Sequence, residues 1–176
     1  MRLIVLCVRR CPYMKWLLAL TILMSPIFDQ DLKIVEVHFK EMLLTVKDRN
    51  GNVLCKFPVA LPAVTPALPA KGLVRKIEIN GAWYPTPKTR AAYFKRTGVE
   101  LAKMIPSGHP LNAMGAGNIA VDFEGKSINP LVRIHGTNDP KSIGQRVTRG
   151  CIRLKNEDFL KLTEVIRGSK TTVIFE

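Results

Sequence analysis

The stretch Thr148–Leu154, which reads TRGCIRL, is the most informative part of this chain. A cysteine that acts as a nucleophile needs a base to take its proton and backbone N–H groups to hold a developing oxyanion. This stretch offers Cys151 the backbone N–H groups of Gly150 and of Cys151 itself, and Arg153 follows as an anchor for an anion. We therefore read it as the nucleophile segment of an enzyme that transfers acyl groups through a thioester.

A base for this cysteine lies sixteen positions upstream, at His135. The segment 136–147 between them is rich in Gly, Pro and Asn, which predicts a loop that joins two neighbouring strands. Contact between nucleophile and base is made by the fold, and sequence separation does not decide it. We expect the charges of Arg149 and Arg153 to lower the pKa of the Cys151 thiol and to favour the reactive thiolate.

Several segments of the chain together resemble the L,D-transpeptidase catalytic domain of the YkuD type. That family carries a His-Gly pair, a loop, and a Ser/Thr-x-Gly-Cys motif followed by a hydrophobic residue and Arg or Asn. The segments that carry the resemblance are IHGT (Ile134–Thr137), SIG (Ser142–Gly144), TRGCIRL and NED (Asn156–Asp158). The segments similar to its periplasmic ErfK/YbiS-like branch, which handles cell-wall peptides, are WYPTP (Trp83–Pro87), IPSG (Ile105–Gly108) and NAMG (Asn112–Gly115).

The resemblance implies a reaction and a role for each residue. Cys151 would attack the carbonyl at the L-centre of meso-diaminopimelate in a peptidoglycan stem tetrapeptide and release D-alanine, and carbapenems would acylate the same thiol. His135 would act as general base and then general acid, while the Gly136 carbonyl orients its ring. Arg149 stands where many members carry His, so it brings a fixed positive charge beside the oxyanion site. The expected substrate-binding residues are Thr148, Arg149 and Arg153.

The fate of the acyl-enzyme stays open at this point. An amine from a second stem peptide or from an anchored lipoprotein would make the protein a transpeptidase. Water would make it an L,D-carboxypeptidase, an endopeptidase or an amidase. A non-enzymatic alternative is a basic module that binds polyanions, because the formal net charge is +13. The chain has no run of five like charges and only 7% aromatic residues, so we expect no nucleic-acid partner.

Metal and cofactor chemistry have no support in the sequence. The chain has no CxxC or HExxH motif, no P-loop and no dinucleotide fingerprint. We therefore predict neither a metal nor a cofactor. Cys55 is expected to be a small buried apolar residue, which is a common place for a free cysteine.

The N-terminal part predicts export. Basic residues up to Lys15 precede the apolar run Trp16–Met24. A membrane-spanning helix needs about 20 apolar residues, so this shorter run is typical of a signal peptide. We predict a signal peptide or membrane anchor over residues 1–28 and a periplasmic or exported protein, which an uncleaved segment would hold at the inner membrane. Cleavage, and a true start at Met14, stay open.

The remaining residues predict one domain, 32–176, with a mostly β fold. Short alternating apolar segments favour a sandwich or barrel-like sheet with one or two short α-helices. The expected helices are 88–96, ending at Gly98, and 157–167, with Asn156 as its N-cap. The segment 58–69 is rich in proline and is expected to be an extended loop. The expected strands are 33–40, 42–47, 52–57, 72–79, 118–123, 131–135 and 171–175.

Overall fold

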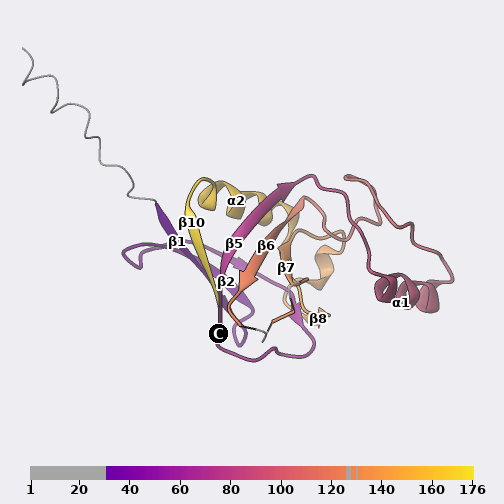
Figure 1. Ribbon diagram of the computed structural model, residues 1–176, viewed down its shortest axis with the longest axis horizontal. Coiled ribbons are helices and arrows are strands. Elements are labelled where there is room, and N and C mark those ends of the chain that lie inside the picture. Colours follow the sequence, from indigo (N-terminus) through magenta and orange to yellow (C-terminus); the bar gives the residue numbers. More distant parts are fainter. Residues whose placement is uncertain (1–30, 126–127, 130) are drawn as a thin grey trace, which may run out of the picture. The chain divides into compact units, whose positions relative to one another are not determined.

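A curled sheet of eight strands organises the structure, a computed structural model that describes residues 31–125, 128–129 and 131–176 (Figure 1). The strand order is β3-β2-β1-β10-β5-β6-β7-β9. The predicted signal or anchor over residues 1–28 lies outside the described residues. The strands are β1 (Leu32–His38), β2 (Leu43–Asp48), β3 (Val53–Pro58), β5 (Ala70–Ile79), β6 (Gly117–Phe123), β7 (Arg133–His135), β9 (Ile152–Arg153) and β10 (Lys170–Phe175).

The mostly β fold predicted from the sequence is confirmed, and the differences lie in two loops. The proline-rich segment contains a short strand, β4 (Leu61–Pro62), which pairs in parallel with β8 (Arg146–Thr148). The predicted loop 136–147 also contains a 3₁₀ turn, η2 (Pro140–Ser142). Alternation of apolar residues predicts neither element, because both are short. β4 is held by its pairing with the distant β8, and η2 by local hydrogen bonds such as Ser142 N–H to the Asp139 carbonyl.

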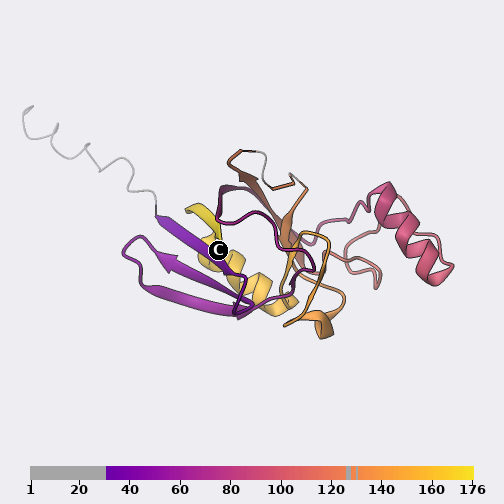
Figure 2. The same ribbon diagram turned by 90° about the horizontal axis from the view of Figure 1, so that it is seen from below.

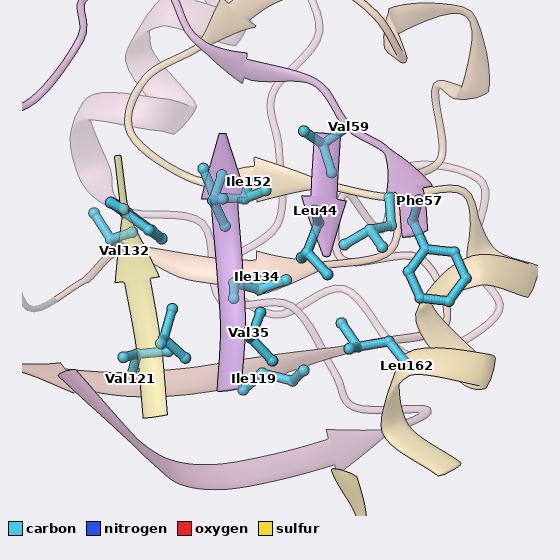
Figure 3. Packing of buried hydrophobic residues seen from close by; sticks show 14 of the residues in the cluster. Val35, Leu44, Phe57, Val59, Ile119, Val121, Val132, Ile134, Ile152 and Leu162 are labelled. Atoms are coloured by element: carbon cyan, nitrogen blue, oxygen red, sulfur yellow. The ribbon is translucent and has the colours of Figure 1, made fainter. Parts of the chain in front are cut away.

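Apolar side chains from most of the sheet and from α2 (Asn156–Ile166) form one core (Figure 3). Residues of α2 that face it are Phe159, Leu162 and Ile166, at the spacing that places side chains on one face of a helix. Each such side chain contributes about 1.5–3 kcal/mol when it leaves water. Since residues of β7 and β9 also belong to this core, the strands beside the predicted site are fixed by packing.

Helix α2 is confirmed, but the predicted role of Asn156 at its start is wrong. The N-cap residue is Lys155, which makes no capping hydrogen bond through its side chain, and Asn156 is already helical. The amide oxygen of Asn156 instead accepts hydrogen bonds from Ala116 N–H and Thr137 N–H, two groups far away in the sequence. The side chain of Asn156 thus makes long-range hydrogen bonds, although local capping rules would assign it to the start of the helix.

Helix α1 (Pro87–Thr97) is also confirmed, and it contains no buried residue. The Thr86 hydroxyl accepts a hydrogen bond from Thr89 N–H at 3.1 Å, and Gly98 ends the helix in the left-handed conformation. Figures 1 and 2 show α1 away from the sheet, on the long segment that leads from β5 to β6. In the described part of the chain, no helix has the length and hydrophobicity to cross a membrane.

Candidate active site

The predicted nucleophile and base come from neighbouring parallel strands. β7 pairs with β9, with His135 opposite Arg153, and Cys151 directly precedes β9. Cys151 and His135 line the same groove, which has a volume of about 1130 Å³. The sheet therefore brings together two residues that the loop separates in the sequence.

His135 is buried and held by backbone groups. Only 3% of the residue is exposed to solvent. The ring atom Nδ1 is 2.5 Å from the Gly136 carbonyl oxygen, which is the contact predicted to orient the ring. Burial lowers the pKa of His135 to about 4, while hydrogen bonds with the Gly136 and Ala113 backbone act in the opposite direction. The ring is therefore neutral at pH 7. When it donates Nδ1–H to Gly136, its Nε2 keeps a lone pair that can accept a proton.

Asn156 joins the segments around the histidine. Its Oδ1 accepts Ala116 N–H at 2.9 Å and Thr137 N–H at 3.0 Å. One amide oxygen thus ties the start of α2 to the segment before β6 and to the end of β7. We call Gly115, Ala116, His135–Thr137 and Asn156 together the histidine corner.

Two glycines let these segments approach. A Cβ at Gly136 would lie 2.4 Å from Asn156 Oδ1, and one at Gly115 would lie 2.1 Å from the same atom. Gly115 also has a φ of +57°, which residues with a side chain rarely adopt. The corner therefore has no room for a larger residue at either position.

The resting state of Cys151 differs from the sequence expectation. Burial raises the pKa of its thiol, and this outweighs the Arg133 N–H group and the charges of Arg133 and Arg153, which act to lower it. The prediction that the arginines would favour a thiolate is therefore wrong in its net direction. The thiol and the imidazole that line this groove are therefore both neutral at pH 7.

A turn closed by Thr148 holds Cys151. The buried Thr148 hydroxyl donates to the Cys151 carbonyl at 2.6 Å and accepts from Gly150 N–H at 3.3 Å. Gly150 has a φ of +148°, in the region that favours glycine. The roles predicted for Thr148 in substrate binding and for Gly150 N–H in holding an oxyanion stay predictions, because in the structure both groups are used within this turn.

The two predicted arginines occupy different positions on the groove. Arg149 is exposed. Arg153 is half-buried, and its Nη1 lies 3.4 Å from Ser142 Oγ and 4.0 Å from an Asp139 carboxylate oxygen. Its Nε is buried with no hydrogen-bond partner among the described residues. An anion in the groove would supply that partner, so Arg153 suits the predicted role of anchor.

Sequence reasoning missed two residues of this site. Arg133, at the start of β7, directs its backbone N–H at the Cys151 sulfur and adds a positive charge. Asn156 lies in the NED segment, where a helix start explained it fully. The resemblance of the NED segment marked Asn156 but gave it no role at the site, and Arg133 lies just outside the IHGT motif.

One group of described residues outside the groove has ligand types that a metal accepts. Atoms of Glu36, His38 and Glu176 lie within 4.8 Å of one another. The Lys47 ammonium is 2.6 Å from the Glu36 carboxylate and supplies a positive charge there. None of the three lines the groove, so this group has no part in the chemistry around Cys151.

The comparisons with known proteins agree with this geometry. The family model for the YkuD L,D-transpeptidase catalytic domain matches residues 33–174. The chain belongs to this family. Its members include relatives in Escherichia coli (strain K12), and the resemblance stated on the sequence motifs is thereby confirmed.

Two of these L,D-transpeptidase relatives match most of the chain. The "Probable L,D-transpeptidase ErfK/SrfK" of E. coli K12 is 34% identical over 143 residues, which cover 80% of this chain and 43% of that protein. The "Probable L,D-transpeptidase YcfS" of the same organism is 38% identical over 146 residues, with the same coverage. The chain thus spans less than half the length of these relatives.

A solved structure shows the same fold. The L,D-transpeptidase LdtMt1, determined in complex with imipenem, superimposes with a TM-score of 0.55 at 16% identity. The match covers 83% of this chain and 59% of that one. The sheet described above is therefore the fold of an L,D-transpeptidase domain.

Proposed function

We propose that residues 32–176 form the catalytic domain of a peptidoglycan L,D-transpeptidase with Cys151 as its nucleophile. The observation that carries the proposal is the shared groove of Cys151 and His135, with the histidine ring held by the Gly136 carbonyl. The family to which the chain belongs supplies the substrate class, the stem peptides of peptidoglycan.

The first half-reaction starts from a neutral pair. The Cys151 sulfur attacks the carbonyl carbon at the L-centre of the donor peptide while its proton passes to Nε2 of His135. The carbonyl becomes an oxyanion. When it collapses, the bond to D-alanine breaks, and the leaving amine takes the proton from the imidazolium. A thioester on Cys151 and free D-alanine remain, and His135 is neutral again.

Positive charge and N–H groups would stabilise the oxyanion. Arg133 and Arg153 both act electrostatically on the Cys151 sulfur, so they also favour negative charge that develops beside it. The backbone N–H groups of Gly150 and Cys151 remain the proposed donors. For Gly150 this requires that its contact with the Thr148 hydroxyl opens as the substrate binds.

In the second half-reaction an amine attacks the thioester carbonyl and His135 takes its proton. The C–S bond then breaks, the Cys151 sulfur takes the proton from the imidazolium, and the neutral pair is restored. The acceptor is a second stem peptide or an anchored lipoprotein. Such substrates lie outside the cytoplasmic membrane, so we propose that the protein is exported and that residues 1–28 direct it there. Hydrolysis of the same thioester is the alternative, and it needs only water in place of the amine.

Release of D-alanine from disaccharide-tetrapeptides, followed by mass spectrometry, tests the proposal. Cys151→Ala should abolish release, whereas Cys55→Ala, at the other cysteine among the described residues, should leave it within about twofold. Full turnover by Cys151→Ala would overturn the assignment. Adding an amine acceptor then decides the second step: a cross-linked product supports transpeptidation, and trimmed tripeptide alone supports hydrolysis.

Acylation by a carbapenem gives an independent test. The relative LdtMt1 is known in complex with imipenem, and a thiol that attacks carbonyl groups should open the same lactam ring. We expect the intact mass of the protein to rise by one imipenem, and we expect no rise for Cys151→Ser. A protein that releases D-alanine but forms no adduct would limit the proposal to peptide substrates.

A further inference from the structure

Helix α1 is a charged helix that the core does not need. It carries four basic residues and no acidic one, and none of its side chains is buried. Its ends are fixed by local contacts, the Thr86 cap and Gly98. A helix with such charge repels itself and gains nothing from apolar burial, so its composition calls for an explanation outside stability.

One face of α1 lines the groove that contains Cys151. The residues on this face are Lys88, Thr89, Ala92, Tyr93 and Arg96, which recur at helical spacing. The other two basic residues of the helix, Arg90 and Lys95, do not line the groove. Two of the four basic residues of α1 therefore line the groove and two do not.

The groove-facing cations are available to a ligand. Among the residues that the structure describes, neither Lys88 nor Arg96 takes part in a salt bridge. The Arg96 guanidinium lies 5.5 Å from the centre of the Tyr93 ring, so the ring supports it on the groove side. Such a supported guanidinium is well suited to bind a carboxylate.

The rest of the groove has the same electrostatic bias. Its acidic lining residues are Glu78 and Asp139. Its basic lining residues are Lys88, Arg96, Arg133, Lys141, Arg149 and Arg153. A volume of about 1130 Å³ exceeds the roughly 300–1,000 Å³ of a small-molecule pocket, so the groove suits an extended anionic chain.

We infer that the groove face of α1, formed by Lys88, Tyr93 and Arg96, is a subsite that binds carboxylate groups of the peptide substrate away from the bond that Cys151 attacks. The inference rests on the proposed function, because the stem peptide is its ligand. Lys88 and Arg96 attract and hold the free carboxylates, and the scissile carbonyl is thereby aligned at the other part of the groove.

Charge removal from the two faces of the region gives a matched experiment. The test variant is Lys88→Ala/Arg96→Ala, and the control is Lys95→Ala/Lys103→Ala, which removes two exposed charges that do not line the groove. For D-alanine release, we expect the test variant to raise KM about tenfold and to keep kcat within about twofold. The control should change neither quantity by more than about twofold.

Substrates with amidated carboxylates complete the test. Amidation should raise KM for the wild type but should hardly raise it further for Lys88→Ala/Arg96→Ala. Both changes remove the same contact, the one between the substrate carboxylates and the two basic side chains. Equal effects of both double variants would overturn the subsite in favour of a general effect of net charge. A change in kcat alone would also overturn it.

A binding measurement separates this inference from the proposed function. Calorimetry with the tetrapeptide can use Cys151→Ala, which binds without turnover. Weaker binding by Cys151→Ala/Lys88→Ala/Arg96→Ala would support the subsite, and equal binding would reject it. If the wild type releases no D-alanine but binding still depends on Lys88 and Arg96, the proposed reaction fails while the subsite holds.

Discussion

His135, in the histidine corner, and one face of α1 line the same groove but are held in opposite ways. His135 is buried, and the corner is fixed by hydrogen bonds among three segments that are distant in the sequence. Helix α1 has no buried residue and is fixed by a cap at each end. The chemistry that we propose thus depends on positions set by the whole fold, while the recognition that we infer depends on charges carried by a locally formed helix.

The largest effect should follow from removing the base. His135→Gln keeps a polar side chain but cannot serve as a general base, so we expect D-alanine release to fall about 10²–10⁴-fold. The change should lie in kcat, unlike the KM effect expected for α1. Thermal unfolding checks that the variant is folded, and a folded variant with normal kcat would remove His135 from the mechanism.

The pKa of Cys151 predicts how its alkylation depends on pH. Since burial raises the pKa of the thiol above its usual value, the thiolate fraction should increase about tenfold per pH unit through neutral pH and beyond pH 9. Iodoacetamide labelling followed by mass spectrometry measures the rate, with Cys151→Ser as the control. A rate that levels off below pH 8 would mean that the arginines outweigh burial after all.

Asn156 tests whether the corner needs its long-range contacts. Asn156→Ala leaves Ala116 N–H and Thr137 N–H without their acceptor and should lower kcat about 10- to 100-fold. Asn156→Asp keeps an acceptor oxygen in place and should restore most of the rate, with a pH profile shifted upward by the added negative charge near His135. Loss of stability without loss of kcat in Asn156→Ala would give Asn156 a purely structural role.

Acid should destabilise the protein through His135. Its pKa is about 4 in the fold, against 6.5 ordinarily, so the unfolded chain binds more protons between these values. The free energy of unfolding should therefore fall as the pH drops from 6.5 to 4, by up to about 3 kcal/mol for this group. Urea unfolding at several pH values measures it, and the difference from His135→Gln isolates the histidine. Parallel curves for the two proteins would contradict the buried neutral ring.

The smallest effect should come from weakening α1 itself. Thr86→Ala removes the N-cap and should cost about 1 kcal/mol of local helix stability. Because the core does not include α1, the melting temperature should hardly change, while KM should rise by about two- to threefold. Thr86→Ser keeps the hydroxyl and is the control. An equal loss of kcat would show that α1 and the histidine corner are not independent.

The same division explains what could be predicted from the sequence. Cys151, His135 and the contact with Gly136 follow from motifs, and the end of α1 follows from Gly98. From the sequence, Asn156 could be explained completely as a helix cap. Its contacts with distant backbone segments become visible only in the structure, where Gly115 and Gly136 lie close to its amide oxygen. The raised pKa of the Cys151 thiol could not be predicted either. The sequence shows which residues are charged, but the burial that raises this pKa depends on the folded structure.

The place of β10 in the sheet has a consequence for how the protein is made. This last described strand lies between β1 and β5 and is the strand through which the two halves of the sheet meet (Figure 1). Strands so far apart in the sequence pair slowly, because the entropy of closing the long loop is lost before the contacts between the strands form. A nascent chain therefore cannot join β1–β3 to the rest of its sheet until residues 170–175 have left the ribosome, whatever has already formed in the part of the sheet that carries Cys151 and His135.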